Sequence, residues 1–219
     1  MRIYSPLVLG LVSASAAAAT SLPINGWYPC SGSNFMPPGS IPGVDSTEEL
    51  PFECAEVKVP LCHEGICDSG TKIDVFVKRI LAQEDASAGK SLWVLQGGPG
   101  MSSVQMEPTM QQVYALLNGT TNVYTMDHRG TGRSTLLKCD AAGAFTSGSP
   151  DGATLNVTES ARCAKDILFQ IENQTVAFSV TSAAKDIVLL TSELNKDEEV
   201  YVYGASYIVC GIPRWHRRF

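Results

Sequence analysis

Hydrophobic and polar residues alternate in the first half of the chain with the period of a β-strand. Within residues 71–81, isoleucine and valine recur at every second position between polar or charged neighbours, which is typical of a strand with one buried face. Residues 56–60 give a shorter strand signal just before it. Together the two segments predict an antiparallel hairpin.

Three later segments are short and almost continuously apolar: residues 91–95, 122–126 and 199–203. This pattern is typical of parallel strands that are buried on both faces. Helix-like stretches lie between these strands: residues 108–117, 158–171 and 182–194. A hairpin followed by repeated strand, loop and helix units predicts an α/β fold with a doubly wound sheet.

The N-terminal part divides into two segments that differ from this pattern. Residues 1–20 place Arg2 before a short apolar run and end in small residues, so they predict a secretory signal peptide and an extracellular protein. The apolar run is too short for the alternative, a membrane anchor, and we expect no membrane span later in the chain. Residues 21–55 are rich in proline, glycine and serine and predict an extended arm. The α/β domain then covers residues 56–207.

Charge limits the partners that the folded part can bind. Four of the 16 basic residues lie in the signal peptide and the last 12 residues, which contain no acidic residue. Residues 20–206 therefore hold 12 basic and 22 acidic residues, a balance of −10. Such a surface argues against nucleic acid and anionic membranes as partners.

Cysteine usage also indicates export. All seven cysteines follow the signal peptide, and six of them precede residue 206. Six cysteines suit three disulfides in an oxidising compartment, with several connectivities that the sequence alone does not choose between. A short Cys62–Cys67 loop is one option, a Cys139–Cys163 bond would brace an insertion, and Cys30 and Cys54 are expected to pin the N-terminal arm. A metal site is the alternative for residues 54, 62, 63 and 67, but their spacing matches no standard zinc pattern. Three glycosylation sequons, at Asn118, Asn156 and Asn173, agree with export.

The strand at residues 199–203 runs into a Gly-x-Ser sequence that ends at Ser206. This is the start of a nucleophile elbow, a strained turn that lifts a serine hydroxyl above the edge of a sheet. The complete motif has a second glycine two residues after the serine, but residue 208 is isoleucine. Ser206 is the candidate nucleophile.

A Gly-Gly-Pro-Gly turn at residues 97–100 follows the strand that ends at residue 95. This is where an α/β-hydrolase has the loop that donates one oxyanion N–H, while the residue after the serine donates the other. Proline has no N–H to donate, so we favour Gly98, then Gly97, with Tyr207 as the second donor. A simple tight turn is the alternative for the same sequence.

Residues 127–134 open directly after the strand at 122–126 and contain two glycines, two arginines, an aspartate and a histidine. A phosphate cradle is one alternative, but the glycine spacing matches no phosphate-binding motif. We predict instead an internal ion pair between Asp127 and Arg129 that shapes this loop beside the oxyanion turn. His128 is then a structural residue.

These three motifs, with the helix at residues 181–187, resemble the secreted serine peptidases of the prolyl aminopeptidase and tripeptidyl aminopeptidase group, over residues 57–207. The resemblance implies an α/β-hydrolase fold, represented by its N-terminal portion, and no cofactor or metal. It also implies attack by Ser206 on peptides with a free N-terminus, with a histidine base that an acid orients.

In that group the helical cap, the acid and the histidine follow the elbow, whereas 13 residues follow Ser206 here. We therefore expect an inactive chain, with a basic tail at residues 208–219 whose composition suggests a shifted reading frame. His216 is the only downstream histidine, and Pro213 argues against a helix that would position it. The alternatives are a non-catalytic secreted binding protein and an esterase-type hydrolase. The oligomeric state is left open.

Overall fold

The computed structural model describes residues 22–32, 50–83, 89–98, 100–139, 157–204 and 206. The predicted signal peptide and the basic tail lie outside these residues, as do Tyr207 and His216.

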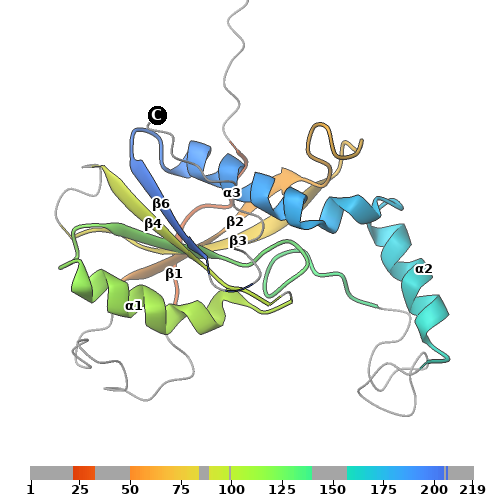
Figure 1. The fold of residues 1–219 in the computed structure, drawn as a ribbon, viewed down its shortest axis with the longest axis horizontal. Coiled ribbons are helices and arrows are strands. Elements are labelled where there is room, and N and C mark those ends of the chain that lie inside the picture. Colours follow the sequence, from red (N-terminus) through yellow and green to blue (C-terminus); the bar gives the residue numbers. More distant parts are fainter. Residues whose placement is uncertain are drawn as a thin grey trace, which may run out of the picture.

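The described strands form one mixed sheet in the order β1-β2-β3-β5-β4-β6 (Figure 1). The strands are β1 (Tyr28–Pro29), β2 (Phe52–Pro60), β3 (Lys72–Ile80), β4 (Lys90–Leu95), β5 (Asn122–Met126) and β6 (Glu199–Gly204). Strands β2 and β3 pair antiparallel over their whole length, which confirms the predicted hairpin. Strand β4 runs parallel to both β5 and β6, because the connections to these strands pass through helices.

Helices cover the two faces of the sheet. Helix α1 (Glu107–Leu116) lies on one face and α3 (Val180–Leu194) on the other, while α2 (Ser160–Gln170) extends away from the sheet (Figure 1). Within α2 only Cys163 is buried. The arrangement is an α/β fold in which a hairpin precedes parallel strands and helices, and it is consistent with the predicted α/β-hydrolase fold.

The core is divided by the sheet because successive side chains of a strand point to opposite faces. On the α3 side, Trp93 and Leu95 of β4 pack with Ile187 and Leu190 of the helix. On the α1 side, Val94 of the same strand joins a second cluster of buried residues: Phe52, Ile80, Met106, Met110, Tyr114 and Val123. Strand β5 is buried along its entire length, as its nearly continuous apolar pattern predicted.

A buried ion pair joins the sheet to α1. The ammonium of Lys78 on β3 lies 2.5 Å from the Glu107 carboxylate at the start of α1 and donates to the Ser31 carbonyl at 2.6 Å. Burial lowers the pKa of Lys78, and the contact with Glu107 acts in the opposite direction. The pair holds the first turn of α1 against β3.

Three disulfides join described residues: Cys30–Cys54 ties the N-terminal arm to β2, Cys62–Cys67 closes the loop after β2, and Cys139–Cys163 joins the segment after β5 to α2. Two of them, Cys62–Cys67 and Cys139–Cys163, are pairs that the sequence offered as options, and Cys30 and Cys54, which were expected to pin the arm, are bonded to each other. Because these cysteines are oxidised, the zinc alternative loses its thiolate ligands. No described helix has both the length and the apolar character needed to span a membrane.

The main difference from the predicted elements concerns burial of β6. The apolar sequence of residues 199–203 predicted a strand buried on both faces, yet Tyr201 is 47% exposed and Tyr203 is 54% exposed. The reason is topological, because β6 is the last strand in the described sheet and pairs only with β4. Its outer edge has no neighbour among the described residues.

Candidate active site

The carboxyl ends of β4 and β6 lie side by side. The two strands are paired in parallel with Leu95 opposite Gly204, and adjacent strands are about 4.8 Å apart. The Gly-Gly-Pro-Gly loop therefore begins beside the segment that carries Ser206. The sheet brings together two motifs that are about a hundred residues apart in the sequence.

Ser206 has a positive backbone φ and an exposed position. Its φ is +57°, in the left-handed region that residues with a side chain rarely adopt, and the residue is exposed. The strand before it ends at Gly204, so the serine lies two residues past the carboxyl end of β6. This matches the strained, exposed serine of the motif.

The loop after β4 depends on glycine at residue 98. Its φ is +142°, and a Cβ there would lie 2.9 Å from the Gly100 nitrogen and 3.1 Å from the Met101 nitrogen. Any side chain would have to displace this backbone. Gly98 is exposed, whereas Gly97 is buried. Both candidate oxyanion donors of this loop thus lie at the edge that carries Ser206.

Asp127 ties this loop to the one that follows β5. Its carboxylate accepts hydrogen bonds from the Ser103 N–H at 2.6 Å, the Ser102 hydroxyl at 3.1 Å and the Arg133 N–H at 2.7 Å. Ser102 also caps the short helix η1 (Ser103–Met106). A Cβ at Gly132 would lie 2.1 Å from a carboxylate oxygen of Asp127, so glycine is needed there to let the loop close around the carboxylate.

The predicted ion pair between Asp127 and Arg129 is wrong. Arg129 forms its ion pair with Asp186 of α3, with 2.6 Å between Nε and one carboxylate oxygen and 2.5 Å between a terminal nitrogen and the other. The physical reason is that Asp127 already accepts hydrogen bonds from two backbone N–H groups and a hydroxyl, while the Arg129 guanidinium reaches Asp186 of α3. Asp127 therefore shapes the loop beside the oxyanion turn without Arg129.

Arg129 uses its full donor capacity. Besides the two bonds to Asp186, it donates to the carbonyls of Leu61 at 2.7 Å, Ala177 at 2.6 Å and Pro60 at 3.0 Å. These bonds use all five guanidinium hydrogens. One buried side chain thus joins the end of β2, the short helix before α3, and α3 itself.

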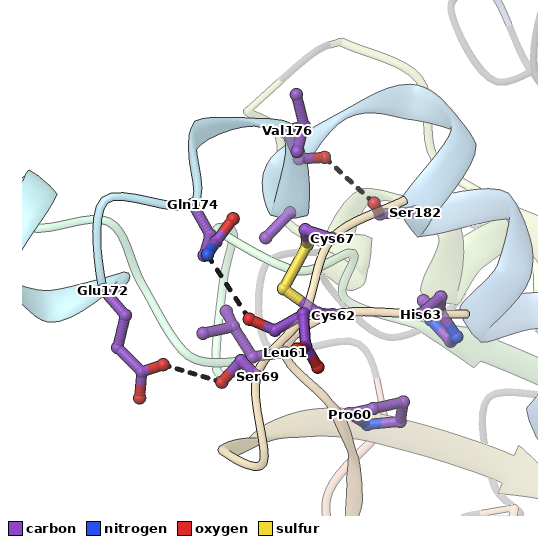
Figure 2. The surroundings of a disulfide bond; sticks show 12 residues. Pro60, Leu61, Cys62, His63, Cys67, Ser69, Glu172, Gln174, Val176 and Ser182 are labelled. Carbon is purple, nitrogen blue, oxygen red and sulfur yellow. Dashed lines mark hydrogen bonds between the residues drawn. A yellow bond between two sulfur atoms is a disulfide. The ribbon is translucent and has the colours of Figure 1, made fainter. Parts of the chain in front are cut away.

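His63 completes this cluster from the disulfide loop. Its Nε2 lies 2.7 Å from Asp186 and 3.1 Å from a terminal nitrogen of Arg129. No guanidinium hydrogen is left for His63, and a carboxylate only accepts hydrogen bonds, so Nε2 must carry a proton and donate to Asp186. Figure 2 shows the surrounding loop, in which the Cys62–Cys67 disulfide lies between His63 and the bond from Ser69 to Glu172.

His128 lies beside the oxyanion loop. Its Nε2 is 3.1 Å from the Gln96 carbonyl, and the side chain is buried. Burial lowers the pKa of His128, with smaller opposing effects from the Gln96 carbonyl and from Asp186 and Asp127. The neutral ring therefore donates from Nε2, because a carbonyl only accepts. Its Nδ1 has no hydrogen-bond partner among the described residues.

The predicted site residues thus fall into two groups. Ser206, Gly97, Gly98 and Asp127 gather at the carboxyl edge of the sheet, whereas Arg129 turns toward α3. Tyr207 lies outside the described residues. Both described histidines have other partners, since His63 binds Asp186 and His128 binds the Gln96 carbonyl.

The sequence did not reveal three partners of residues 127–134. Asp186 and His63 contact Arg129, and Ser102 donates to Asp127. Asp186 had a detectable signal, since it stands on the apolar stripe of α3 between Ala183 and Ile187. A charged residue in such a stripe indicates a buried partner of opposite charge. The sequence contains no comparable signal for the bonds from Ser102 or His128, which depend on loop conformation.

Comparison with protein-family models gives no match for this chain, and neither does comparison with curated protein sequences. Among solved structures, a proline iminopeptidase-related protein from Thermus thermophilus matches with 22% identity and a TM-score of 0.35, over 68% of this chain and 35% of its own. A protein of Agrobacterium vitis described as a hydrolase matches with 10% identity and a TM-score of 0.30, over 71% of this chain and 50% of its own. The thioesterase domain of the curacin biosynthetic pathway matches with 12% identity and a TM-score of 0.25, over 63% of this chain and 42% of its own.

The chain spans between about a third and a half of the length of these structures. All three TM-scores are below 0.5. A functional assignment therefore depends on the strand register and the side chains of the chain itself.

Proposed function

We propose that this chain carries the nucleophile and the oxyanion loop of a serine hydrolase that acts by acyl transfer. The observation that supports this most strongly is the parallel pairing of Leu95 with Gly204. It brings an exposed serine in a left-handed turn beside a glycine loop with donor N–H groups. A serine in this position can attack an acyl carbonyl to form a tetrahedral intermediate, and the N–H groups of the loop can stabilise its oxyanion.

The resemblance of the motifs to secreted aminopeptidases suggests the substrate class. Peptides with a free N-terminus are the proposed substrates, attacked at a carbonyl by the Ser206 hydroxyl. The three disulfides support export, because disulfides persist in oxidising compartments. Asn118 and Asn173 are exposed and are proposed to carry glycans.

No described residue is assigned as the catalytic base. Without a base the serine hydroxyl is a weak nucleophile, so we expect slow covalent reaction and little turnover from this chain. A strong serine-directed electrophile is therefore a better test than a substrate. A fluorophosphonate probe in excess should form an adduct that peptide mass spectrometry locates on Ser206.

The matched controls are S206A, which should not be labelled, and S192A, which removes an exposed serine on α3 and should be labelled like the unmodified chain. An adduct on Ser206 supports the proposal. Labelling that persists in S206A, or no labelling of the chain at all, would refute it.

A non-catalytic binding protein is the second candidate. The observation in its favour is the exposed outer strand β6, where Tyr201, Val202 and Tyr203 are each more than a third exposed. A Ser206 that stays unlabelled, together with binding of a protein partner through β6, would favour the binding protein. An esterase-type hydrolase uses the same elbow and oxyanion loop, and it is separated from a peptidase by comparing matched ester and peptide substrates.

A further inference from the structure

The backbone direction at the end of β4 determines where the oxyanion donors point. The Val94 carbonyl accepts a hydrogen bond from the Thr125 hydroxyl of β5 at 2.6 Å. The Gln96 carbonyl accepts one from His128, which follows β5. Two carbonyls at alternate positions thus face β5, as expected for an extended backbone that continues past the strand end.

The peptide bond between Gln96 and Gly97 then fixes the direction of the next N–H. In a planar trans peptide the C=O and the N–H point in opposite directions. Because the Gln96 carbonyl points toward His128 and β5, the Gly97 N–H points away from them, toward β6. Strand β6 leads directly to Ser206.

The Gly97 N–H also stands out, because Gly97 is buried and no hydrogen bond joins its N–H to an acceptor within the part of the chain that the structure describes. Buried backbone N–H groups without an acceptor are rare in folded proteins and call for an explanation. An oxyanion of a bound acyl group would be the missing acceptor.

His128 is suited to hold this peptide in place. Its ring is buried, and it makes one described hydrogen bond, from Nε2 to the Gln96 carbonyl. The opposite nitrogen, Nδ1, has no described partner. The one hydrogen bond described for this buried ring is thus directed at the Gln96 carbonyl.

We propose that His128 is a positioning residue that orients the Gln96–Gly97 peptide so that the Gly97 N–H faces Ser206. Gly97 is then the primary oxyanion donor of the loop, ahead of Gly98. The role of Gly97 as an oxyanion donor rests on the proposed function. The orientation of the Gln96–Gly97 peptide can be measured without it, so the orientation and the proposed function can be refuted separately.

The experiment uses the full chain and three variants. H128M removes the donor and keeps a similar volume, H128Q places an amide N–H near the Nε2 position, and Q105A is the matched control. Gln105 accepts a hydrogen bond from the Gln96 side chain at 2.9 Å, so Q105A changes a contact of Gln96 without touching its carbonyl. Each variant is first checked for an unchanged thermal midpoint relative to Q105A.

The first readout is the Gly97 amide resonance in a ¹⁵N–¹H correlation spectrum. We expect it to shift in H128M and to return toward its original position in H128Q, with no change in Q105A. The second readout is the rate of fluorophosphonate labelling at Ser206. It should fall at least about tenfold in H128M and recover in H128Q, since loss of an oxyanion donor outright costs about 100-fold or more.

An unchanged Gly97 resonance in H128M would overturn the inference, whatever the labelling result. Equal labelling rates in the unmodified chain and H128M would also overturn it. If no form is labelled, the proposed function fails, and the Gly97 resonance alone decides whether His128 orients the peptide.

Discussion

The buried guanidinium of Arg129 gives the most quantitative prediction for the fold. Both members of its ion pair are inaccessible, with side-chain exposures of 1% for Arg129 and 0% for Asp186. In R129M the Asp186 carboxylate stays buried without its counter-charge, which costs about 3–5 kcal/mol in comparable cases. The carbonyls of Leu61, Ala177 and Pro60 also lose their donor. Each unsatisfied buried group costs about 1–3 kcal/mol, although these costs overlap.

We therefore expect R129M to lower the free energy of unfolding by at least about 4 kcal/mol. The assay is urea unfolding with the disulfides intact, followed by tryptophan fluorescence. Trp93 is a suitable probe because it is fully buried and stacks on Tyr124, with 4.9 Å between ring centroids. R129K should lose less, because it keeps the positive charge but not the five donors.

The control is the surface pair between Lys58 and Asp74, whose side chains are 49% and 39% exposed. K58M should cost less than about 1 kcal/mol, because exposed pairs are screened by water. A double-mutant cycle of R129M with D186N isolates the coupling, which we expect to be about 2–3 kcal/mol. The reasoning is refuted if R129M costs no more than K58M, or if the cycle gives no coupling.

Two further predictions concern the loop after β5. G132A should lower the free energy of unfolding in urea by about 2–4 kcal/mol, because its Cβ would clash with Asp127 at a φ of +52°. G65A is the control for the backbone cost alone, because Gly65 has a φ of +78° and open space around its Cβ position. Equal losses of stability in the two variants would contradict the clash. Burial lowers the pKa of His128 in the folded state, so the unfolded chain binds more protons below pH of about 6.5. Stability should fall on acidification below that value, by up to about 1.4 kcal/mol per pH unit. H128Q should remove this part of the slope, and identical slopes at pH 5.5 and 7.5 would count against the buried neutral ring.

The strands were predictable from the sequence because their periodicity reflects burial. Residues 122–126 are nearly continuously apolar and form a strand of the same bounds, buried on both faces. The hairpin followed from the alternation of Ile73, Val75 and Val77, which are all buried, although Phe76 and Lys78 between and after them are buried as well. The prediction that β6 is buried was wrong, because its apolar sequence does not reveal which strands lie beside it.

The candidate site was predictable only as far as motifs mark strand ends. The positions of Ser206 and the glycine loop follow from Gly-x-Ser and Gly-Gly-Pro-Gly placed after strands. The pairing of Arg129 was not predictable from neighbouring residues. Its partner, Asp186, is 57 residues further along the chain and reaches it only through the packing of α3. Long-range partners of this kind depend on tertiary packing, which local patterns do not contain.

A crystal structure of the phosphonylated protein tests the central claim most directly. We predict a phosphonate bonded to the Ser206 oxygen, with its phosphoryl oxygen about 2.7–3.1 Å from the nitrogen of Gly97. A phosphoryl oxygen that points into solvent, or a Ser206 hydroxyl that lies on the far side of β6 from the glycine loop, would contradict the account.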